Sequence, residues 1–253
     1  MPVAEPLLQS IAARKAELDA LRPLSGQALA QLQAYYDVEL TYTSNAIEGN
    51  TLTSRETAEV IAHGITVGGK PLKDHLEAVD HHAALQWARG LAASPAPFDE
   101  RTIRELHARI VARSRPEIAG LYSQHARRVA GSAAVFPNPA KIPSLMADLG
   151  ADLACAAPVP EAIFDIHFRL TAIHPFSDGN GRTARLLMNM LLLRAGYPPI
   201  AVRPEDRLAY LAALEQASVA QDASAYQALM HQRLDDTLAE YLAALKQSTS
   251  PGA

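Results

Sequence analysis

The sequence predicts an all-α protein with one small β-hairpin. Apolar residues recur every three or four positions through most of the chain, which is the period of amphipathic helices. Alanine and leucine are abundant while aromatic residues make up only 6% of the chain, a composition that favours helices. Only residues 120–138 depart from this period, and their Gly, Pro and alternating small and β-branched residues indicate an extended hairpin or flap.

The first half of the chain predicts five helices. They cover residues 5–21, residues 26–47 with a break near 43, residues 55–65, residues 72–93 and residues 101–114. Ser54 and Asp99 precede the third and fifth helices and are residue types that cap helix N-termini. Pro95 and Pro97 end the fourth helix, because proline lacks the backbone N–H that a helix needs.

The second half predicts five more helices. Four of them cover residues 140–156, 159–173, 204–217 and 222–246. The other begins within residues 174–185 and ends at Arg194. Gly196 and the Pro198–Pro199 pair stop the helix that ends at Arg194. The length of 253 residues fits one large domain or a domain with an extension. We expect an N-terminal helical region at 1–70, a core at 71–217, and a C-terminal helix with its tail at 218–253.

Composition and charge narrow the class of protein. The formal net charge of −4 argues against a nucleic acid as the main partner, since such proteins usually carry a basic surplus. No run of about 18 apolar residues predicts a membrane span, and no N-terminal secretion signal is visible, so we expect a cytoplasmic protein. The single cysteine, Cys155, excludes an internal disulfide and is expected to be a small buried residue.

Residues 174–185, HPFSDGNGRTAR, contain a loop of the kind that binds phosphate. Gly179 and Gly181 flank Asn180 and permit backbone torsions that let successive N–H groups converge on an anion. A helix begins directly afterwards, so its free N–H groups and positive dipole end point to the same place.

The side chains of this segment add the chemistry that a phosphate chain requires. Arg182 and Arg185 are three residues apart and share a helix face, and arginine forks suit phosphate oxygens. Asp178 offers the oxygen ligand that Mg²⁺ prefers, and a neutral His174 would accept a proton from a hydroxyl. Phe176 is expected to anchor the loop in the core. A plain helix–turn–helix explains each residue alone but not the complete set.

The segment resembles the signature of the Fic family, HPFx[D/E]GN[G/K]RxxR, at every specified position, and the likeness extends from about residue 36 to 217. The resemblance implies the Fic fold and transfer of AMP from ATP to a Ser, Thr or Tyr hydroxyl of a protein. It implies these roles: His174 as general base, Asp178 as the Mg²⁺ ligand, Gly179, Asn180 and Gly181 around the phosphates, Arg182 at the β-phosphate and Arg185 at the γ-phosphate. Glycine at position 181 fits the AMP-transferring majority.

The resemblance also implies a flap and a base pocket. Residues 127–137 would form a β-hairpin over the nucleotide that pairs with the target's backbone; an ordinary surface loop is the alternative. Its small residues would lie close over the ligand, namely Ala130, Gly131, Ser132 and Ala133. Tyr210 falls where the family often has an aromatic residue near the adenine. Ser218 stands where the family often has asparagine, which leaves the choice of base open.

A second motif lies in TSNAIEGN, residues 43–50. Ser44, Glu48 and Gly49 resemble the inhibitory motif of the family, [S/T]xxxE[G/N], in the class that carries it N-terminally in the same chain. The resemblance implies an inhibitory helix at about 36–50. If Glu48 pairs with Arg185, it occupies the arginine that would hold the γ-phosphate, so ATP would bind with its α-phosphate misaligned. A small misplacement of the reacting atoms costs about a hundredfold in rate.

Several alternatives stay open at this stage. Some relatives use the same glutamate to remove AMP from a modified protein, and others use UTP or GTP. The hypothesis of a non-catalytic nucleotide-binding scaffold is disfavoured, because the histidine, the aspartate and both arginines of the motif are intact. A zinc hydrolase is disfavoured because the nine histidines show no HExxH spacing. The sequence does not identify the protein target, and the chain itself is one candidate. It also does not decide whether the chain forms a homodimer.

Overall fold

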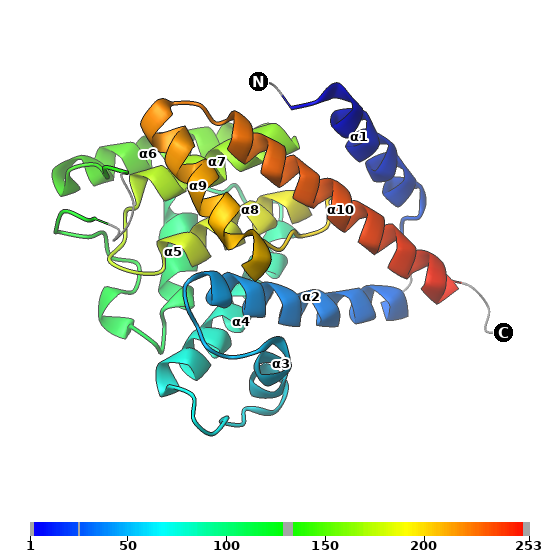
Figure 1. Ribbon diagram of the computed structural model, residues 1–253, viewed down its shortest axis with the longest axis horizontal. Helices are drawn as coiled ribbons and strands as arrows, with labels where there is room; N and C mark the ends of the chain where they lie inside the picture. Colours follow the sequence, from blue (N-terminus) through cyan, green and yellow to red (C-terminus); the bar gives the residue numbers. More distant parts are fainter. Residues whose placement is uncertain (1–2, 25, 129–133, 250–253) are drawn as a thin grey trace.

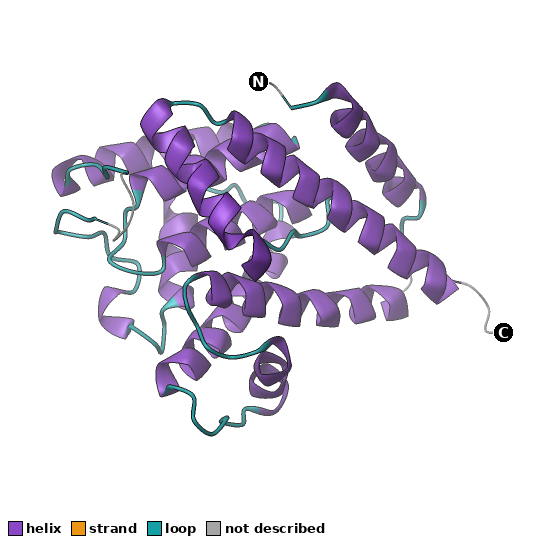
Figure 2. Cartoon of the chain, in the orientation of Figure 1, coloured by secondary structure: helices purple, strands orange, loops and turns teal. Residues whose placement is uncertain are grey.

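The computed structural model describes residues 3–24, 26–128 and 134–249 (Figure 1). The all-α prediction is confirmed, because these residues form helices and loops and no strand (Figure 2). The α-helices are α1 (Glu5–Ala20), α2 (Gly26–Ile47), α3 (Ser54–His63), α4 (Leu72–Ala92), α5 (Glu100–Ile110), α6 (Ile142–Cys155), α7 (Pro160–Ile173), α8 (Asn180–Arg194), α9 (Arg207–Ala220) and α10 (Ser224–Thr249). Short 3₁₀ turns occupy Pro116–Ile118, Pro139–Lys141 and Pro204–Asp206.

Helix α8 lies at the centre of the fold. It packs against α7, α4, α5 and α2, and all but one of the residues from Asn180 to Leu192 are buried. A helix that is covered all round in this way belongs to the core of the protein. Its N-terminus carries the motif of residues 174–185, so the candidate site is built on an enclosed element of the fold.

Helices from both ends of the chain cover this core. α1 packs along α10, and α2 lies between α4 and α10 (Figure 1). The expected boundary at residue 217 falls inside α9. Among the described residues, no helix combines the length and the apolar character that a bilayer span requires.

The N-terminal boundary of α3 differs from the prediction by one residue. Thr53, not Ser54, is the N-cap, because its hydroxyl accepts the Glu56 N–H and the Glu56 carboxylate accepts the Thr53 N–H in return. Ser54 is the first helical residue.

The predicted break of α2 near residue 43 is absent. Thr43 and Asn45 direct their side chains to the carbonyls of Glu39 and Thr41, four residues back, so they bond within the helix rather than ending it. The helix therefore carries Ser44 in regular geometry and ends at Ile47, directly before Glu48.

Helix α5 ends at Ile110 rather than at residue 114. The fully buried Asp80 of α4 explains the early end, because its carboxylate accepts the backbone N–H groups of Arg113 and Ser114 at 2.8 and 2.9 Å. These N–H groups bond across to α4 instead of continuing the helix.

The predicted hairpin is not seen in the part of the flap that the structure describes. Residues 127, 128 and 134–137 form no strand, and Ala130, Gly131, Ser132 and Ala133 lie outside the described residues. The one isolated bridge among the described residues joins Tyr122 to Phe176 of the motif loop. Cys155 is exposed at the end of α6, so the expectation that it is buried was wrong.

Candidate active site

The loop between α7 and α8 is closed by its own side chains. Asn180 accepts the Phe176 N–H at 2.9 Å and donates to the Phe176 carbonyl at 2.8 Å. His174 and Gly179 both adopt left-handed torsions, with φ of 51° and 75°. Because both polar atoms of the buried Asn180 amide bond Phe176, this side chain holds the loop in its closed shape.

Phe176 anchors the loop in the core, as the sequence predicts. Its ring is fully buried and stacks on His107 of α5 with ring centroids 3.7 Å apart. His107 Nε2 donates to the Asp178 carbonyl at 3.0 Å, while its Nδ1 accepts the Gly120 N–H at 3.0 Å. Burial lowers the pKa of His107 to about 4, so the neutral ring has one donor and one acceptor, as these contacts require.

His174 ends α7 and lies in contact with the described part of the flap. Its ring centroid is 4.2 Å from that of Phe136. Burial lowers the pKa of His174 below its ordinary value, and the nearby Glu48 carboxylate partly opposes this shift. The imidazole is therefore neutral at pH 7, which is the form that accepts a proton.

The structure brings Arg185 together with Ser44 and Glu48, which precede it by about 140 residues in the sequence. Arg185 Nη2 donates to Glu48 Oε1 at 2.7 Å and to the Ser44 carbonyl at 2.7 Å, and its Nε donates to Ser44 Oγ at 3.1 Å. The Arg185 side chain is 5% exposed and that of Glu48 is 40% exposed. The ion pair thus has one buried partner and one that reaches solvent.

Glu48 lies over the first turn of α8. A Cβ built on Gly181 would lie 2.2 Å from Glu48 Oε1 and 2.9 Å from Arg185 Nη1, so this approach requires glycine at position 181. The carboxylate stands where the free N–H groups of a helix N-terminus attract an anion. Gly49, with φ of 93°, turns the chain away directly after Glu48.

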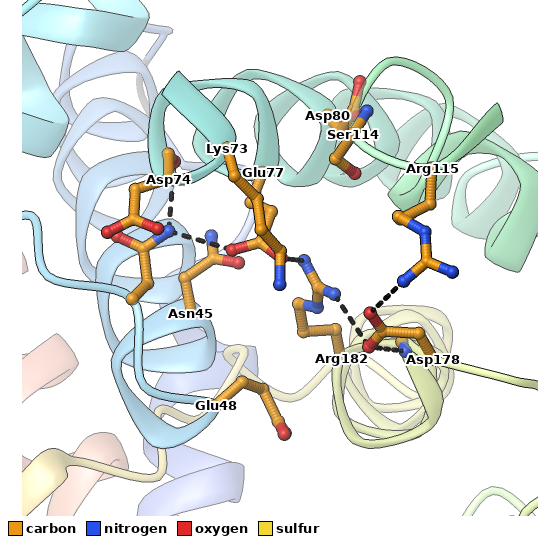
Figure 3. A network of polar contacts seen from close by, with 12 residues as sticks. Asn45, Glu48, Lys73, Asp74, Glu77, Asp80, Ser114, Arg115, Asp178 and Arg182 are labelled. Carbon is orange, nitrogen blue, oxygen red and sulfur yellow. Dashed lines mark hydrogen bonds and ion pairs between the residues drawn. The ribbon is translucent and has the colours of Figure 1, made fainter. Parts of the chain in front are cut away.

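Asp178 and Arg182 belong to a second polar network (Figure 3). Arg182 lies between Glu77 of α4 and Asp178, with N–O distances of 3.1 and 3.5 Å. Arg115 approaches the other Asp178 oxygen at 3.4 Å. Glu77 also accepts from Asn50 at 3.2 Å, which ties the segment after Glu48 to α4.

Asp178 suits a Mg²⁺ ion that arrives with a phosphate chain. Its side chain is 32% exposed, and two arginines orient its oxygens. The described residues contain no group of three or more His, Cys, Asp or Glu side chains that would hold a metal by itself. A phosphate-bound Mg²⁺ needs only one or two protein carboxylates, so a single aspartate fits this ion.

Tyr210 does not line a base pocket, which corrects the sequence-based expectation. It is 1% exposed, and its hydroxyl contacts His167 Nε2 at 3.0 Å inside the core. Ser218 instead lines a cavity of about 370 Å³ together with Phe136 and Phe168. Its hydroxyl donates to the Leu214 carbonyl one turn back, at 2.9 Å.

Sequence reasoning missed His107, Glu77, Asp80 and Arg115. They come from α4, α5 and the segment after α5, and no short spacing relates them to the motif. For the three that lie on helices, His107, Glu77 and Asp80, the local sequence offers one signal, which is a polar residue on an otherwise buried helix face.

The site is defined by the buried helix α8, which carries two buried arginines near its N-terminus. A neutral histidine and a partly exposed aspartate lie in the loop before this helix. Residues 97–192 of this helical domain match the profile of the Fic/DOC family. The chain belongs to the Fic/DOC family.

Relatives support this assignment over nearly the whole chain. A Fic domain containing signaling protein from Bacteroides thetaiotaomicron is 30% identical, superimposes with a TM-score of 0.84, and is covered over 99% of its chain and 96% of this one. Fic-1 (residues 134–508) from C. elegans has a TM-score of 0.86 at 27% identity, over 96% of this chain and 73% of that one. The protein adenylyltransferase Fic of Nematostella vectensis is 36% identical over 192 residues, which are 74% of this chain but 44% of the relative. The chain thus spans less than half the length of that curated relative.

Proposed function

We propose that this chain is a protein adenylyltransferase that moves AMP from ATP to a Ser, Thr or Tyr hydroxyl of a protein, and that Glu48 holds it in a repressed state. The observation that carries the proposal is the contact of Glu48 with Arg185 at 2.7 Å over the anion-binding end of α8. The relatives named protein adenylyltransferase Fic support the reaction class.

The residues of the loop divide the reaction between them. His174, neutral at pH 7, accepts the proton of the target hydroxyl as its oxygen bonds to the α-phosphorus. The bond from the α-phosphorus to the bridging oxygen breaks, and pyrophosphate leaves. The N–H groups of the first turn of α8, with Arg182 and Arg185, stabilise the charge that develops on the phosphates. Mg²⁺, held by Asp178, would neutralise phosphate charge when ATP is bound.

Glu48 opposes this arrangement in two ways. It occupies the guanidinium that the γ-phosphate needs, and it places a carboxylate charge where phosphate charge must lie. ATP bound beside it is misaligned for in-line attack, which costs about a hundredfold or more in rate.

The experiment compares wild type, Glu48→Gly and His174→Ala after incubation with ATP and Mg²⁺, with UTP and GTP in parallel. Intact-mass spectrometry reports any adduct on the chain or on an added target protein. We expect an AMP-sized adduct in Glu48→Gly, little in wild type and none in His174→Ala. Glu59→Gly, which changes an exposed glutamate of α3, is the matched control and should behave as wild type. No adduct from any nucleotide in Glu48→Gly would refute the proposal.

A second function, removal of AMP from a modified protein, is favoured by one observation. The Glu48 side chain is 40% exposed while it lies over the motif, so water reaches its carboxylate beside the phosphate site. In that reaction Glu48 would align a water molecule for attack on the phosphorus. Release of AMP from a pre-modified protein by wild type, and loss of release in Glu48→Gly, would identify the hydrolase.

A further inference from the structure

A cavity of about 590 Å³ opens at the base of the flap, next to the start of α6. Residues 122–126 form one wall, and residues 138–140 with Pro143 form the other. All of these residues are among those that the structure describes, and they lie on the two sides of the flap. The cavity that contains Ser218 is a different space, because the two cavities share no lining residue.

Backbone contacts join this cavity to the motif. The Ser123 N–H donates to the Pro175 carbonyl at 2.8 Å, and Tyr122 forms an isolated bridge with Phe176. Pro175 directly follows His174, the proposed general base. A target segment whose hydroxyl reaches His174 can therefore continue along the wall formed by residues 122–126.

Three cations border the cavity without a carboxylate partner. Arg127 and Arg128 directly follow one wall, and the exposed Lys141 lies within the other. Arg127 Nε donates to Ser123 Oγ at 3.0 Å, which holds this cation at the wall. Among the residues that the structure describes, none of these three side chains forms an ion pair, whereas most other arginines and lysines do.

Two residues of α5 reach the same wall with opposite charges. The Tyr122 hydroxyl donates to Glu100 at 2.6 Å, and Arg104 lies over the Tyr122 ring with its guanidinium carbon 5.3 Å from the ring centroid. Because these two charges offset each other, Arg127, Arg128 and Lys141 leave the cavity with a positive rim. The chain as a whole carries a net charge of −4, so this rim differs in sign from the rest of the molecule.

We propose that the target protein presents an acidic segment to this cavity, with carboxylate side chains beside the Ser, Thr or Tyr that receives AMP. This inference rests on the proposed function for the reaction at His174. Because the three rim cations give up no internal ion pair when a target binds, its carboxylates add charge pairs without breaking any. The negative charge of the remaining surface directs such a segment toward the rim.

Three peptides test the preference. Each carries a single Thr, flanked by Asp and Glu, by Asn and Gln, or by Lys. Mass spectrometry measures the initial rate of AMP transfer to each peptide, well below saturation, by the Glu48→Gly chain with ATP and Mg²⁺. We expect the acidic peptide to react about tenfold faster than the neutral one and the Lys peptide to react slowest, because each exposed charge pair contributes up to about fivefold. Equal rates for the three peptides would overturn the proposal.

Charge reversal on the rim provides the second test. Arg128 and Lys141 are both exposed, so Arg128→Glu and Lys141→Glu are combined in the Glu48→Gly chain. The acidic peptide should lose its advantage and the Lys peptide should become the faster one. A merely structural effect would slow all three peptides alike, and that result would contradict the proposal. Arg55→Glu is the matched control, because Arg55 is an exposed residue of α3 that forms no ion pair with the described residues, and it should leave the order of rates unchanged.

Peptide binding without nucleotide separates this inference from the proposed function. Fluorescence anisotropy should show tighter binding of the acidic peptide than of the Lys peptide, with the difference reduced to about twofold in 0.5 M salt. If the proposed function fails, no peptide gains AMP but this binding preference remains. If the inference fails, AMP is transferred but binding shows no preference. Tighter binding of a single-stranded oligonucleotide of the same charge than of the acidic peptide would assign the rim to nucleic acid and overturn the proposal.

Discussion

Arg182 and Glu77 form a buried ion pair, with Nη1 and Oε1 3.1 Å apart and side chains 2% and 7% exposed. Arg182 is one of the two motif arginines, and Arg185 is paired with Glu48. Each motif arginine therefore meets a carboxylate from the N-terminal third of the chain. The two carboxylates differ in exposure, because Glu77 is enclosed whereas Glu48 reaches solvent. We attribute a structural role to Glu77 and the regulatory role to Glu48.

Glu77→Ala should strongly destabilise the protein. Truncating one partner of a buried pair leaves the other charge without compensation, which costs about 3–5 kcal/mol. Asn50 would also lose an acceptor, which loosens the segment that follows Glu48. Urea denaturation followed by circular dichroism measures the loss.

Lys73→Ala is the control for this variant. Lys73 approaches the same Glu77 oxygen at 3.4 Å, but its side chain is 56% exposed, so its loss should cost under about 1 kcal/mol. Similar losses in the two variants would show that burial of the Arg182–Glu77 pair does not govern its contribution.

Gly181→Ala should partly release repression. The new methyl group would lie 2.2 Å from Glu48 Oε1, and the flexible end of the glutamate side chain moves more readily than the helix backbone. We expect an AMP adduct level between those of wild type and Glu48→Gly, measured by intact mass. On the Glu48→Gly background the methyl group has no carboxylate to displace and should give no further increase. A wild-type adduct level in Gly181→Ala would show that Glu48 tolerates the methyl group.

The motif residues could be placed from sequence because each set is contiguous on a helix or loop. Glu48 and Ser44 are separated by one helical turn, and the predicted pairing of Glu48 with Arg185 is present in the structure. The sequence also contained a signal against placing Tyr210 near the adenine. Tyr210, Ala213, Leu214 and Ala217 are the buried face of α9 and recur at helical spacing. This pattern places Tyr210 in the core, whereas Leu208 and Leu211 face outward.

The supporting residues could not be found in this way. His107 and Glu77 reach the motif from α5 and α4, and only tertiary packing brings them together. The boundary of α5 depended on Asp80 of α4 for the same reason. Local patterns predict which face of a helix is buried, but not which polar groups meet on that face.

The titration of His174 should respond to Glu48. Burial lowers the pKa of His174 and the Glu48 carboxylate raises it, so Glu48→Gly should lower that pKa further. NMR titration of the His174 Cε1–H signal should give a midpoint below 6.5 in wild type and a lower one in Glu48→Gly. Glu59→Gly should match wild type. A higher midpoint in Glu48→Gly would mean that the carboxylate does not act on this imidazole.

Stability should fall as the pH drops below about 6.5. Burial lowers the pKa of His81 and His167 to about 3 and that of His107 to about 4. Below pH 6.5 the unfolded chain binds protons at these histidines while the folded chain does not, so acid favours unfolding. Each histidine contributes up to about 1.4 kcal/mol per pH unit until its folded pKa is reached.

His81→Leu isolates one of these contributions. The His81 Nδ1 atom is buried without a hydrogen-bond partner, so the leucine removes a titrating group without breaking a bond at that nitrogen. Between pH 6 and 4.5, the free energy of unfolding of this variant should fall less steeply than that of wild type, by up to about 1.4 kcal/mol per pH unit. Urea denaturation at several pH values measures both slopes. Equal slopes would show that His81 becomes protonated in the folded protein over this range, and would contradict a pKa of about 3 for this buried histidine.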